Sequence, residues 1–279
     1  MKYYVLYNPY AGSGNGKQEA ETFGEKAEGE VSYFDVTTLT DYATFFSNLE
    51  KDAEVVVCGG DGTVNRFLNA IRGIEIEQKI SYYACGSGND FLRDVGQGDN
   101  KLVPLDEYRK GLPTVTVNGE EYVFINGVGY GIDGYCCEVG DKLRATSEKP
   151  VNYTAIAIKG LLFEYKPTNA TVCVDGKEYA FKKVWIAPTM KGRYYGGGMM
   201  PTPKQTRDSG EVSLMVFHGS GKLKTLMIFP SIFKGEHVKK EKHVTVFTGK
   251  EITVKFDEPR PLQIDGETIL GVSEYTVKA

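Results

Sequence analysis

Residues 54–63 of this chain read Glu-Val-Val-Val-Cys-Gly-Gly-Asp-Gly-Thr. The apolar and β-branched run before the glycines predicts a strand that is buried on both faces. The residues that follow, 64–72, predict a helix that Gly73 closes. The stretch therefore predicts a strand, a glycine turn and a helix in direct succession, which is the unit from which α/β domains are built.

The glycine turn in this stretch has the properties of a phosphate site. Gly59, Gly60 and Gly62 allow positive φ and let the backbone approach a ligand closely. The helix N-terminus adds N–H groups and a partial positive charge, both of which favour phosphate. An acidic residue, Asp61, is compatible with such an anion site if its carboxylate binds a magnesium ion carried by the phosphate. The alternative is a simple tight turn in which Thr63 caps the next helix. The turn predicts a nucleoside triphosphate site and leaves that alternative open.

Two further segments repeat the pattern of a strand and a glycine turn. Residues 2–7 predict a strand that leads into Asn8-Pro9 and a glycine loop ending at Lys17, as in a phosphate cradle with a cation. The loop is not a Walker A motif, because its glycine spacing is shorter and it lacks the Ser or Thr that would hold magnesium. Residues 80–85 predict another strand, followed by Gly86-Ser87-Gly88-Asn89-Asp90-Phe91. Each segment alone is also explained as a connection or a helix cap, but the repetition favours a shared site.

Residues 262–267, Leu-Gln-Ile-Asp-Gly-Glu, lie near the end of the chain. Asp-Gly between two alternating runs is a hairpin signal, so an ordinary turn explains it. A second interpretation places Asp265 and Glu267 two positions apart on one strand, where both side chains face the same side. One carboxylate would then make the other a stronger base.

The chain of 279 residues is long enough for two domains, which we place at residues 1–110 and 111–279. The first alternates strands and helices, which predicts a parallel three-layer α/β domain. The second is dominated by strands with hairpin signals such as Asn118-Gly119, which predicts an antiparallel β-sandwich. Helical interruptions are expected near 152–165 and 222–234.

One motif in the second domain competes with this interpretation. Residues 129–134 fit G-x-G-x-x-G, the dinucleotide-binding signature. That signature needs a parallel βαβ unit, whereas the Asn118-Gly119 hairpin predicts antiparallel strands at this point. We therefore expect no dinucleotide site here.

Composition restricts the partners and the compartment. A net charge of −4 and a pI near 5.6 argue against nucleic acid as a partner. Five cysteines without metal-ligand or disulfide spacing suit a reducing cytosol. We find no apolar run of the ~20 residues that span a bilayer and no signal peptide, which predicts a cytoplasmic protein. The basic segment 237–243 is a candidate membrane contact, or else a solvated connection.

The motifs occur in an order that is typical of one family. Asn8-Pro9 with its glycine loop, the turns at 59–63 and 86–91, and Asp265-Gly266-Glu267 follow one another along the chain. In this combination the chain resembles the bacterial diacylglycerol kinase-like lipid kinases over residues 2–278. These enzymes are related to sphingosine and ceramide kinases and, more distantly, to NAD kinases. The resemblance implies the fold of NAD and diacylglycerol kinases.

The resemblance also implies roles for individual residues. The implied ATP-binding residues are Asn8, Pro9, Lys17, Gly59, Gly60, Gly62, Thr63, Gly86, Ser87, Gly88 and Asn89. Asp61, Asp90 and Asp133 are expected to hold Mg²⁺ through water, because magnesium loses its hydration shell reluctantly.

The remaining implied roles concern carboxylates. Asp265, or else Glu267, is expected to take the proton from the acceptor hydroxyl, with Asp61 completing the catalytic set. Asp208 lies in a turn, 207–211, where some relatives hold a structural divalent ion. An Asp-Ser-Gly turn also explains itself without a metal.

These observations predict an ATP- and Mg²⁺-dependent lipid kinase that converts diacylglycerol to phosphatidic acid. Other lipids (a sphingoid base, a polyprenol, phosphatidylglycerol), a soluble acceptor such as NAD, and a non-catalytic binding module are the alternatives. The enzyme is expected to meet its lipid by transient association with the inner face of the membrane. Exposed strand edges in the second domain would permit a homodimer.

Overall fold

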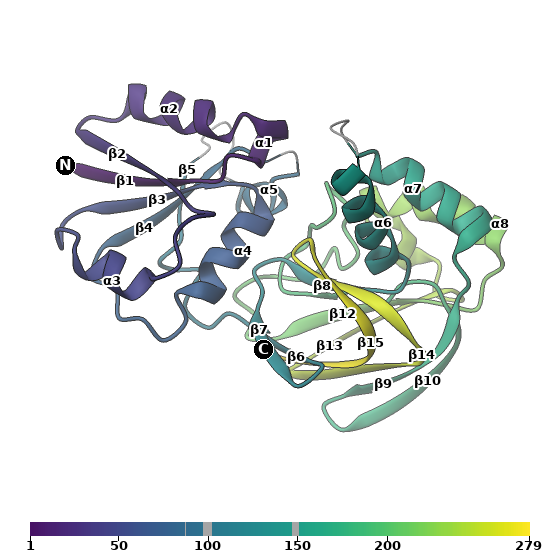
Figure 1. Ribbon diagram of the computed structural model, residues 1–279. Coiled ribbons are helices and arrows are strands. Elements are labelled where there is room, and N and C mark those ends of the chain that lie inside the picture. The colour runs from purple at the N-terminus through teal and green to yellow at the C-terminus, as the bar shows by residue number, and fades with distance from the viewer. Residues whose placement is uncertain (87, 97–101, 147–150) are drawn as a thin grey trace. The chain divides into compact units, whose positions relative to one another are not determined.

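The protein is described by a computed structural model that covers residues 1–86, 88–96, 102–146 and 151–279 (Figure 1). Ser87, one of the expected ATP-binding residues, lies outside these ranges. The chain forms two compact units, Met1–Leu112 and Pro113–Ala279, which we call unit 1 and unit 2. The sequence analysis placed the boundary after residue 110.

Unit 1 alternates strands and helices in the order that the sequence predicts. Its elements are β1 (Lys2–Tyr7), α1 (Ala11–Gly14), α2 (Gly16–Lys26), β2 (Glu30–Asp35), α3 (Tyr42–Ser47), β3 (Glu54–Gly59), α4 (Asp61–Ala70), β4 (Lys79–Ala84), α5 (Asp90–Val95) and β5 (Leu102–Pro104). The segment α1 is not a regular helix, because Gly12 and Ser13 have left-handed φ angles of 56° and 61°. The first glycine segment is therefore a loop, as expected.

The strands of unit 1 form one sheet with helices on both faces. The strand order is β2-β1-β3-β4-β5, in which the first four strands run parallel and β5 pairs antiparallel with β4. Figure 1 shows α2 on one side of the sheet and α3 and α4 on the other. The run Val55, Val56 and Val57 in β3 is fully buried, as a strand covered on both faces requires. The three-layer α/β prediction is confirmed, with β5 as an antiparallel edge that the sequence did not reveal.

Unit 2 consists mainly of strands. Its elements are β6 (Thr114–Val117), β7 (Glu120–Val123), β8 (Gly127–Tyr130), α6 (Ile132–Thr146), α7 (Tyr153–Lys159), η1 (Gly160–Glu164), β9 (Thr168–Val174), β10 (Lys177–Val184), β11 (Thr189–Met190), β12 (Val212–Phe217), α8 (Lys222–Ile228), η2 (Phe229–Lys234), η3 (Glu236–Lys239), β13 (Val244–Gly249), β14 (Glu251–Ile264) and β15 (Glu267–Lys278). The two helical interruptions expected near 152–165 and 222–234 are both present.

The strands of unit 2 pair antiparallel in the order β13-β12-β11-β8-β14-β15-β6-β7, with β9 joining β14 to β10. Strand β14 shifts register around Arg260, so that its first half pairs with β9 and its second half with β8. The glycine motif at 129–134 runs from the end of β8 into the start of α6, and the partners of β8, β11 and β14, are both antiparallel to it. The dinucleotide-binding interpretation lacks the parallel unit that it requires, as predicted.

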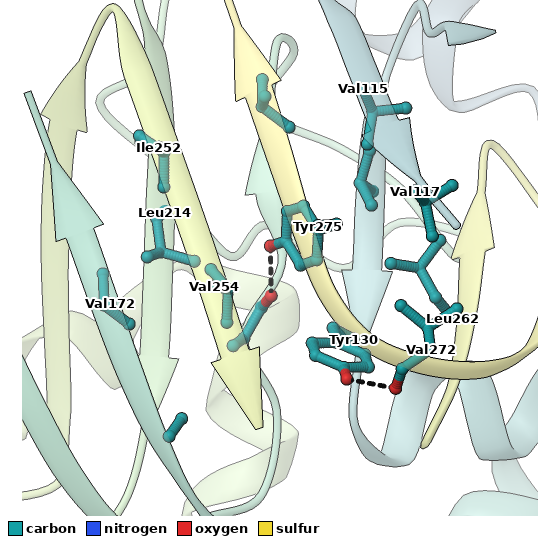
Figure 2. Packing of buried hydrophobic residues seen from close by; sticks show 14 of the residues in the cluster. Val115, Val117, Tyr130, Val172, Leu214, Ile252, Val254, Leu262, Val272 and Tyr275 are labelled. Carbon is teal, nitrogen blue, oxygen red and sulfur yellow. Dashed lines mark hydrogen bonds between the residues drawn. The ribbon is translucent and has the colours of Figure 1, made fainter. Parts of the chain in front are cut away.

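The core of unit 2 is formed mainly by inward side chains from seven strands, β6, β8, β9, β10, β12, β14 and β15, and several of these side chains are labelled in Figure 2. Two buried hydroxyl groups lie in this apolar core. Tyr130 donates to the carbonyl oxygen of Val272, and Tyr275 donates to the carbonyl oxygen of Ala187 at 3.0 Å. Because both hydroxyls have partners, burying them carries no desolvation penalty from an unmade hydrogen bond.

Candidate functional site

In unit 1 the three predicted glycine segments meet at the carboxyl ends of neighbouring strands. Strands β1, β3 and β4 are adjacent and parallel, so the segments that follow them emerge at one edge of the sheet. A Cβ atom on Gly86 would lie 2.5 Å from the Cα atom of Gly60, and one on Gly12 would lie 2.7 Å from the carbonyl oxygen of Cys85. The glycines are therefore required for backbone to pack on backbone, and the sequence prediction of a shared site in unit 1 agrees with this geometry.

Asn8 links the first segment to the second. Its side-chain Nδ2 donates to Thr63 Oγ1 at 2.9 Å, and its backbone N–H donates to the carbonyl oxygen of Cys58 at 3.0 Å. Helix α4 begins at Asp61 with Gly60 as its N-cap, and the backbone N–H of Thr63 donates to Gly60 O at 3.0 Å. Thr63 is therefore not the N-cap that the simple-turn alternative assigned to it: Gly60 is the N-cap, and the Thr63 hydroxyl accepts from Asn8.

Asp61 joins the second and third segments. Its Oδ2 accepts the backbone N–H of Asp90 and its Oδ1 accepts that of Phe91, both at 2.9 Å. Asp61 thereby caps the N-terminus of α5, whose own N-cap residue Asn89 has φ 48° and makes no side-chain cap. Asp90 is 3% exposed in the first turn of α5, and it receives the cap of Asp61 rather than providing one. Two carboxylates and the N-termini of two helices therefore lie together.

The remaining predicted residues of unit 1 are less constrained. Lys17 lies in the first turn of α2, with an exposed side chain whose ammonium is 4.0 Å from a carboxylate oxygen of Glu21. Pro9 and Gly88 are half-buried beside Asn8 and Asn89 in the chain. The hydroxyl of Tyr82 donates to Asn89 Oδ1 over a long 3.4 Å contact. Unit 1 thus presents a backbone cradle fixed by hydrogen bonds, with the exposed ammonium of Lys17 on α2.

In unit 2, Asp265 does not share a strand with Glu267. Strand β14 ends at Ile264, β15 begins at Glu267, and Asp265 occupies the turn between them with φ 46°. The expectation that both carboxylates face one side of a single strand is therefore wrong, because Asp-Gly adopts the left-handed turn that a two-residue hairpin favours. Glu267 is half-buried at the first position of β15.

The carboxylate of Asp265 is held by the backbone of a distant segment. Oδ2 accepts the N–H of Ile125 at 2.6 Å, and Oδ1 accepts those of Asn126 and Gly127 at 2.9 and 2.8 Å. Three N–H donors favour the ionised carboxylate and fix its orientation. With 7% of its surface exposed, Asp265 is a rigidly oriented charge.

Two basic residues that the sequence analysis did not single out surround the same loop. Arg207 donates from Nη1 to Ile125 O at 2.6 Å and from Nη2 to Asn126 Oδ1 at 2.7 Å. The backbone N–H of Lys191 donates to Asn126 O at 2.9 Å. Burial and the neighbouring Arg207 guanidinium lower the pKa of Lys191. Nothing in the local sequence of either residue reveals these contacts, because their partners lie far along the chain.

Asp133 is the third predicted acid, and it is buried in the first turn of α6. Its Oδ2 accepts a hydrogen bond from Gln263 Nε2 at 2.9 Å. Burial raises the pKa of Asp133 to about 6, and the bond from Gln263 partly opposes this shift. A Cβ atom on Gly129 would lie 1.5 Å from Oδ2, so the motif glycine serves to admit this carboxylate. Through its bond with Gln263, Asp133 therefore stabilises the β14–β15 hairpin, whose turn residue Asp265 follows Gln263 by two positions.

The turn at 207–211 holds an amide rather than an arrangement of acids. Asp208 is exposed. The side-chain amide nitrogen of Gln205 is surrounded by four oxygens: Thr206 O and Glu211 O at 3.0 Å, and Lys191 O and Ser209 Oγ at 3.4 Å. The Gln205 carbonyl oxygen accepts from Ser213 Oγ at 2.6 Å. An amide NH₂ thus occupies the place where a cation would meet these oxygens.

The described residues provide neither a ready-made metal cluster nor a helix that could span a membrane. Across residues 1–86, 88–96, 102–146 and 151–279, no three His, Cys, Asp or Glu side chains gather in a group that could hold a metal ion. Within the same ranges, no helix combines the length and the apolarity that a bilayer crossing requires.

Known proteins resemble this chain along nearly its whole length. Residues 2–116 match the diacylglycerol kinase catalytic domain, and residues 126–277 match the YegS C-terminal NAD kinase beta sandwich-like domain. The chain is 24% identical over 310 residues to the putative lipid kinase YtlR of Bacillus subtilis (strain 168), covering 98% of this chain and 95% of that protein. It is 23% identical over 282 residues to a diacylglycerol kinase of the same strain, covering 94% and 88%.

A solved structure shares the fold. The crystal structure of a putative diacylglycerol kinase from Bacillus anthracis str. Sterne superposes with a TM-score of 0.69 at 20% identity, covering 100% of this chain and 91% of that one. The arrangement of an α/β unit followed by an antiparallel β unit is therefore common to both proteins.

Proposed function

Because the chain belongs to the diacylglycerol kinase-like lipid kinases, we propose that it transfers the γ-phosphate of ATP to a lipid hydroxyl, that of diacylglycerol, giving phosphatidic acid. As a member of this family, the protein is a phosphotransferase with an alcohol group as acceptor. The observation that carries the proposal is the convergence in unit 1 of three glycine segments with two helix N-termini and Asp61.

Unit 1 is assigned to ATP. Backbone N–H groups at helix N-termini bind phosphate oxygens without a side chain, and glycines let the phosphate come close. The N–H of Thr63 is used inside its own turn, so Gly60 and Gly62 are the preferred donors. Lys17 is exposed on α2, and its length lets it follow the phosphates as a cation.

Magnesium is expected to arrive with the nucleotide. The described residues contain no ready-made group of three acidic ligands, and both oxygens of Asp61 already accept N–H groups. This donor set suits an ion that keeps its water, with Asp61 and Asp90 holding it through that water. When bound, the ion neutralises charge that develops on the phosphates.

Asp265 is assigned to the acceptor hydroxyl. Phosphoryl transfer passes through a loose transition state that depends on positioning more than on covalent chemistry. Three backbone N–H groups hold the Asp265 carboxylate in one orientation, which suits a group that has to position a substrate. It would orient the hydroxyl and take its proton as the bond to phosphorus forms. Glu267 remains the alternative base.

The test is transfer of labelled γ-phosphate to a panel of lipids in mixed micelles, with NAD as a soluble control. Diacylglycerol, a sphingoid base, a polyprenol and phosphatidylglycerol should be offered in parallel, each with and without Mg²⁺. We expect label in phosphatidic acid that depends on Mg²⁺. Label in another lipid would correct the acceptor, and label only in NADP would overturn the lipid assignment.

The base is tested by comparing Asp265→Asn with Glu267→Gln. An Asn at 265 turns an NH₂ group toward one of three N–H donors, which costs about 1–3 kcal/mol of stability as well as the proton acceptor. Turnover must therefore be compared at equal folded fraction. If Glu267→Gln loses turnover and Asp265→Asn loses only stability, the role of base moves to Glu267.

A further inference from the structure

Unit 2 exposes large apolar side chains on its helices. Phe163 of η1 is 74% exposed, and Leu223 and Met227 of α8 are 73% and 69% exposed. The two elements pack on each other, and Lys222 at the start of α8 donates to the carbonyl oxygen of Leu162 in η1 at 2.8 Å. Figure 1 shows α7, which η1 continues, and α8 on the same side of unit 2. We call Phe163, Leu223 and Met227 the helical patch.

The pattern in α8 shows that this exposure does not come from an imperfectly buried helix. Thr225 and Ile228 are 1% and 5% exposed and face the unit. Leu223 and Met227 lie four residues apart and share the opposite face. A surface helix normally places polar residues on that face. Large apolar side chains gathered there mark an interaction surface.

Lysines are interleaved with the helical patch. Residues 151–166 and 221–235 together contain five lysines and one glutamate, in a chain whose net charge is −4. The glutamate, Glu164, is paired with Lys159 at 2.7 Å. Lys224 is exposed next to Leu223 in the chain, and Lys234 is exposed next to Phe233, which is itself 43% exposed at the end of η2. Apolar side chains alternating with cations match a surface that is apolar below and anionic above, which is a bilayer with acidic headgroups.

We propose that η1 and α8 are the surface on which unit 2 docks to an anionic lipid bilayer. Phe163, Leu223 and Met227 enter the boundary between headgroups and acyl chains, while Lys224 and Lys234 contact acidic headgroups. The proposal rests on the proposed function, since a kinase of a membrane lipid has to reach its acceptor in the bilayer. It adds which surface makes that contact.

The basic segment 237–243, which the sequence marked as a candidate membrane contact or else a solvated connection, is less suited to this role. His237 is 1% exposed and its Nε2 lies 2.9 Å from Pro201 O. Lys239 lies 3.8 Å from a carboxylate oxygen of Glu236. Residues 236–243, all of which the structure describes, offer no exposed large apolar side chain. Charge alone would attract this segment to a bilayer, but it has nothing to insert.

Vesicle co-sedimentation without nucleotide tests the docking surface. The wild-type chain is mixed with vesicles of phosphatidylglycerol and phosphatidylcholine, or of phosphatidylcholine alone. Serine replaces the helical patch in the triple variant Phe163→Ser, Leu223→Ser, Met227→Ser, and the control is Leu270→Ser, an apolar residue 58% exposed on β15. All four positions are exposed, so little stability is at stake.

We expect the triple variant to lose at least about tenfold in partitioning to the acidic vesicles, with Leu270→Ser unchanged. Binding by wild type should fall with added salt, and Lys224→Gln with Lys234→Gln should weaken it where Lys255→Gln does not. Wild-type binding by the triple variant would overturn the proposal. So would loss of a homodimer in the triple variant with vesicle binding intact, since the patch would then be a protein interface.

Kinase assays separate this proposal from the proposed function. The triple variant should keep wild-type turnover on a monomeric short-chain diacylglycerol and lose it on long-chain diacylglycerol in vesicles. Equal loss on both would place the patch in the catalytic machinery and overturn a docking role. If the protein phosphorylated no lipid but its vesicle binding still depended on the helical patch, the docking surface would be supported and the proposed kinase function would be wrong.

Discussion

The glycine segments of unit 1 and the Asp265 turn of unit 2 are built in opposite ways: the first from backbone alone, the second around a charged side chain. In unit 1 the cradle is made of backbone, and its shape depends on side chains being absent from Gly12, Gly60 and Gly86. In unit 2 a charged side chain, that of Asp265, is inserted among the backbone N–H groups of residues 125–127. We propose that the cradle of unit 1 receives an anion, whereas unit 2 supplies an anion of its own and surrounds it.

The difference determines what each region tolerates. An added methyl group is the damaging change in unit 1, because backbone has no rotamer with which to yield. A removed or neutralised charge is the damaging change in unit 2, because buried N–H groups would lose their acceptor. Asp61 is the exception in unit 1, since its carboxylate performs the same capping for α5 that Asp265 performs for its loop.

Asp61 offers the largest expected effect and the sharpest test of this exception. Asp61→Ala should lower turnover about 100- to 1000-fold through the lost charge, and should cost about 1 kcal/mol through the lost cap. Asp61→Asn keeps one oxygen for capping but turns its NH₂ group toward the other N–H donor, so it should lose some stability as well as most of the turnover, and turnover must be compared at equal folded fraction. Kinase assays and denaturant unfolding of both variants measure the two effects.

The exposed Asp208→Asn serves as the matched control for charge removal, and we expect it to leave turnover unchanged. If Asp61→Asn kept wild-type turnover, Asp61 would be a cap alone, and the two regions would differ less than proposed.

Asp133 should give unit 2 a pH dependence that unit 1 does not share. Its pKa is raised from 3.8 to about 6 by burial, so the folded protein holds this proton more tightly than the unfolded chain. The resulting stabilisation is complete below pH 3.8 and is lost as pH rises through about 6. Asp133→Asn should therefore gain about 3 kcal/mol relative to wild type between about pH 4 and about pH 8.

Trp185, the single tryptophan and 1% exposed in unit 2, reports this unfolding by fluorescence. Denaturant unfolding of wild type and variant at both pH values gives the difference directly, because the other titrating groups cancel. Parallel curves for the two proteins across this range would show that Asp133 titrates alike when folded and unfolded.

A methyl group at Gly86 tests the backbone cradle. Gly86→Ala would place a Cβ atom 2.5 Å from Gly60 Cα, so strands β3 and β4 must separate at that edge. We expect a loss of about 1–3 kcal/mol in unit 1 together with weaker ATP binding. The control is Gly73→Ala, whose φ of 75° imposes strain but whose Cβ atom meets nothing within 4 Å.

Hydrogen exchange of the β3 and β4 amides measures this loss, with Trp185 fluorescence as the unit 2 reference. Gly86 is not among the glycines with a left-handed φ, so a Gly86→Ala variant as stable as the wild type would show that the close approach of Gly86 to Gly60 does not constrain the cradle.

The two regions were also unequally predictable from sequence. The strand, glycine turn and helix at residues 54–70 follow from local sequence preferences. The same succession of an apolar strand, a glycine turn and a helix start at residues 80–91 correctly predicted the second strand and helix. That Asp61 caps α5 depends on β3 and β4 being neighbours, which no local pattern states. In unit 2 the carboxylate of Asp265 meets Ile125, 140 residues away along the chain. Sequence periodicity predicts which face of a helix or strand is buried, but not which distant residues that face contacts. The hydrogen bonds of Arg207 and Gln263 to distant residues were therefore not predicted.

The smallest expected effect concerns the turn at 207–211. Removing divalent ions from the wild-type protein with a chelator should leave the Trp185 unfolding midpoint unchanged, because the Gln205 amide already satisfies the oxygens of Thr206 and Glu211. Gln205→Glu should reverse this. A carboxylate facing those carbonyl oxygens is repelled, but the same oxygens form a hard ligand set for Ca²⁺ or Mg²⁺. The variant should therefore be less stable than wild type in chelator and regain stability with added Ca²⁺. A chelator-sensitive wild type would instead mean that a cation binds to unit 2 beside the amide and that unit 2 needs this cation for its stability.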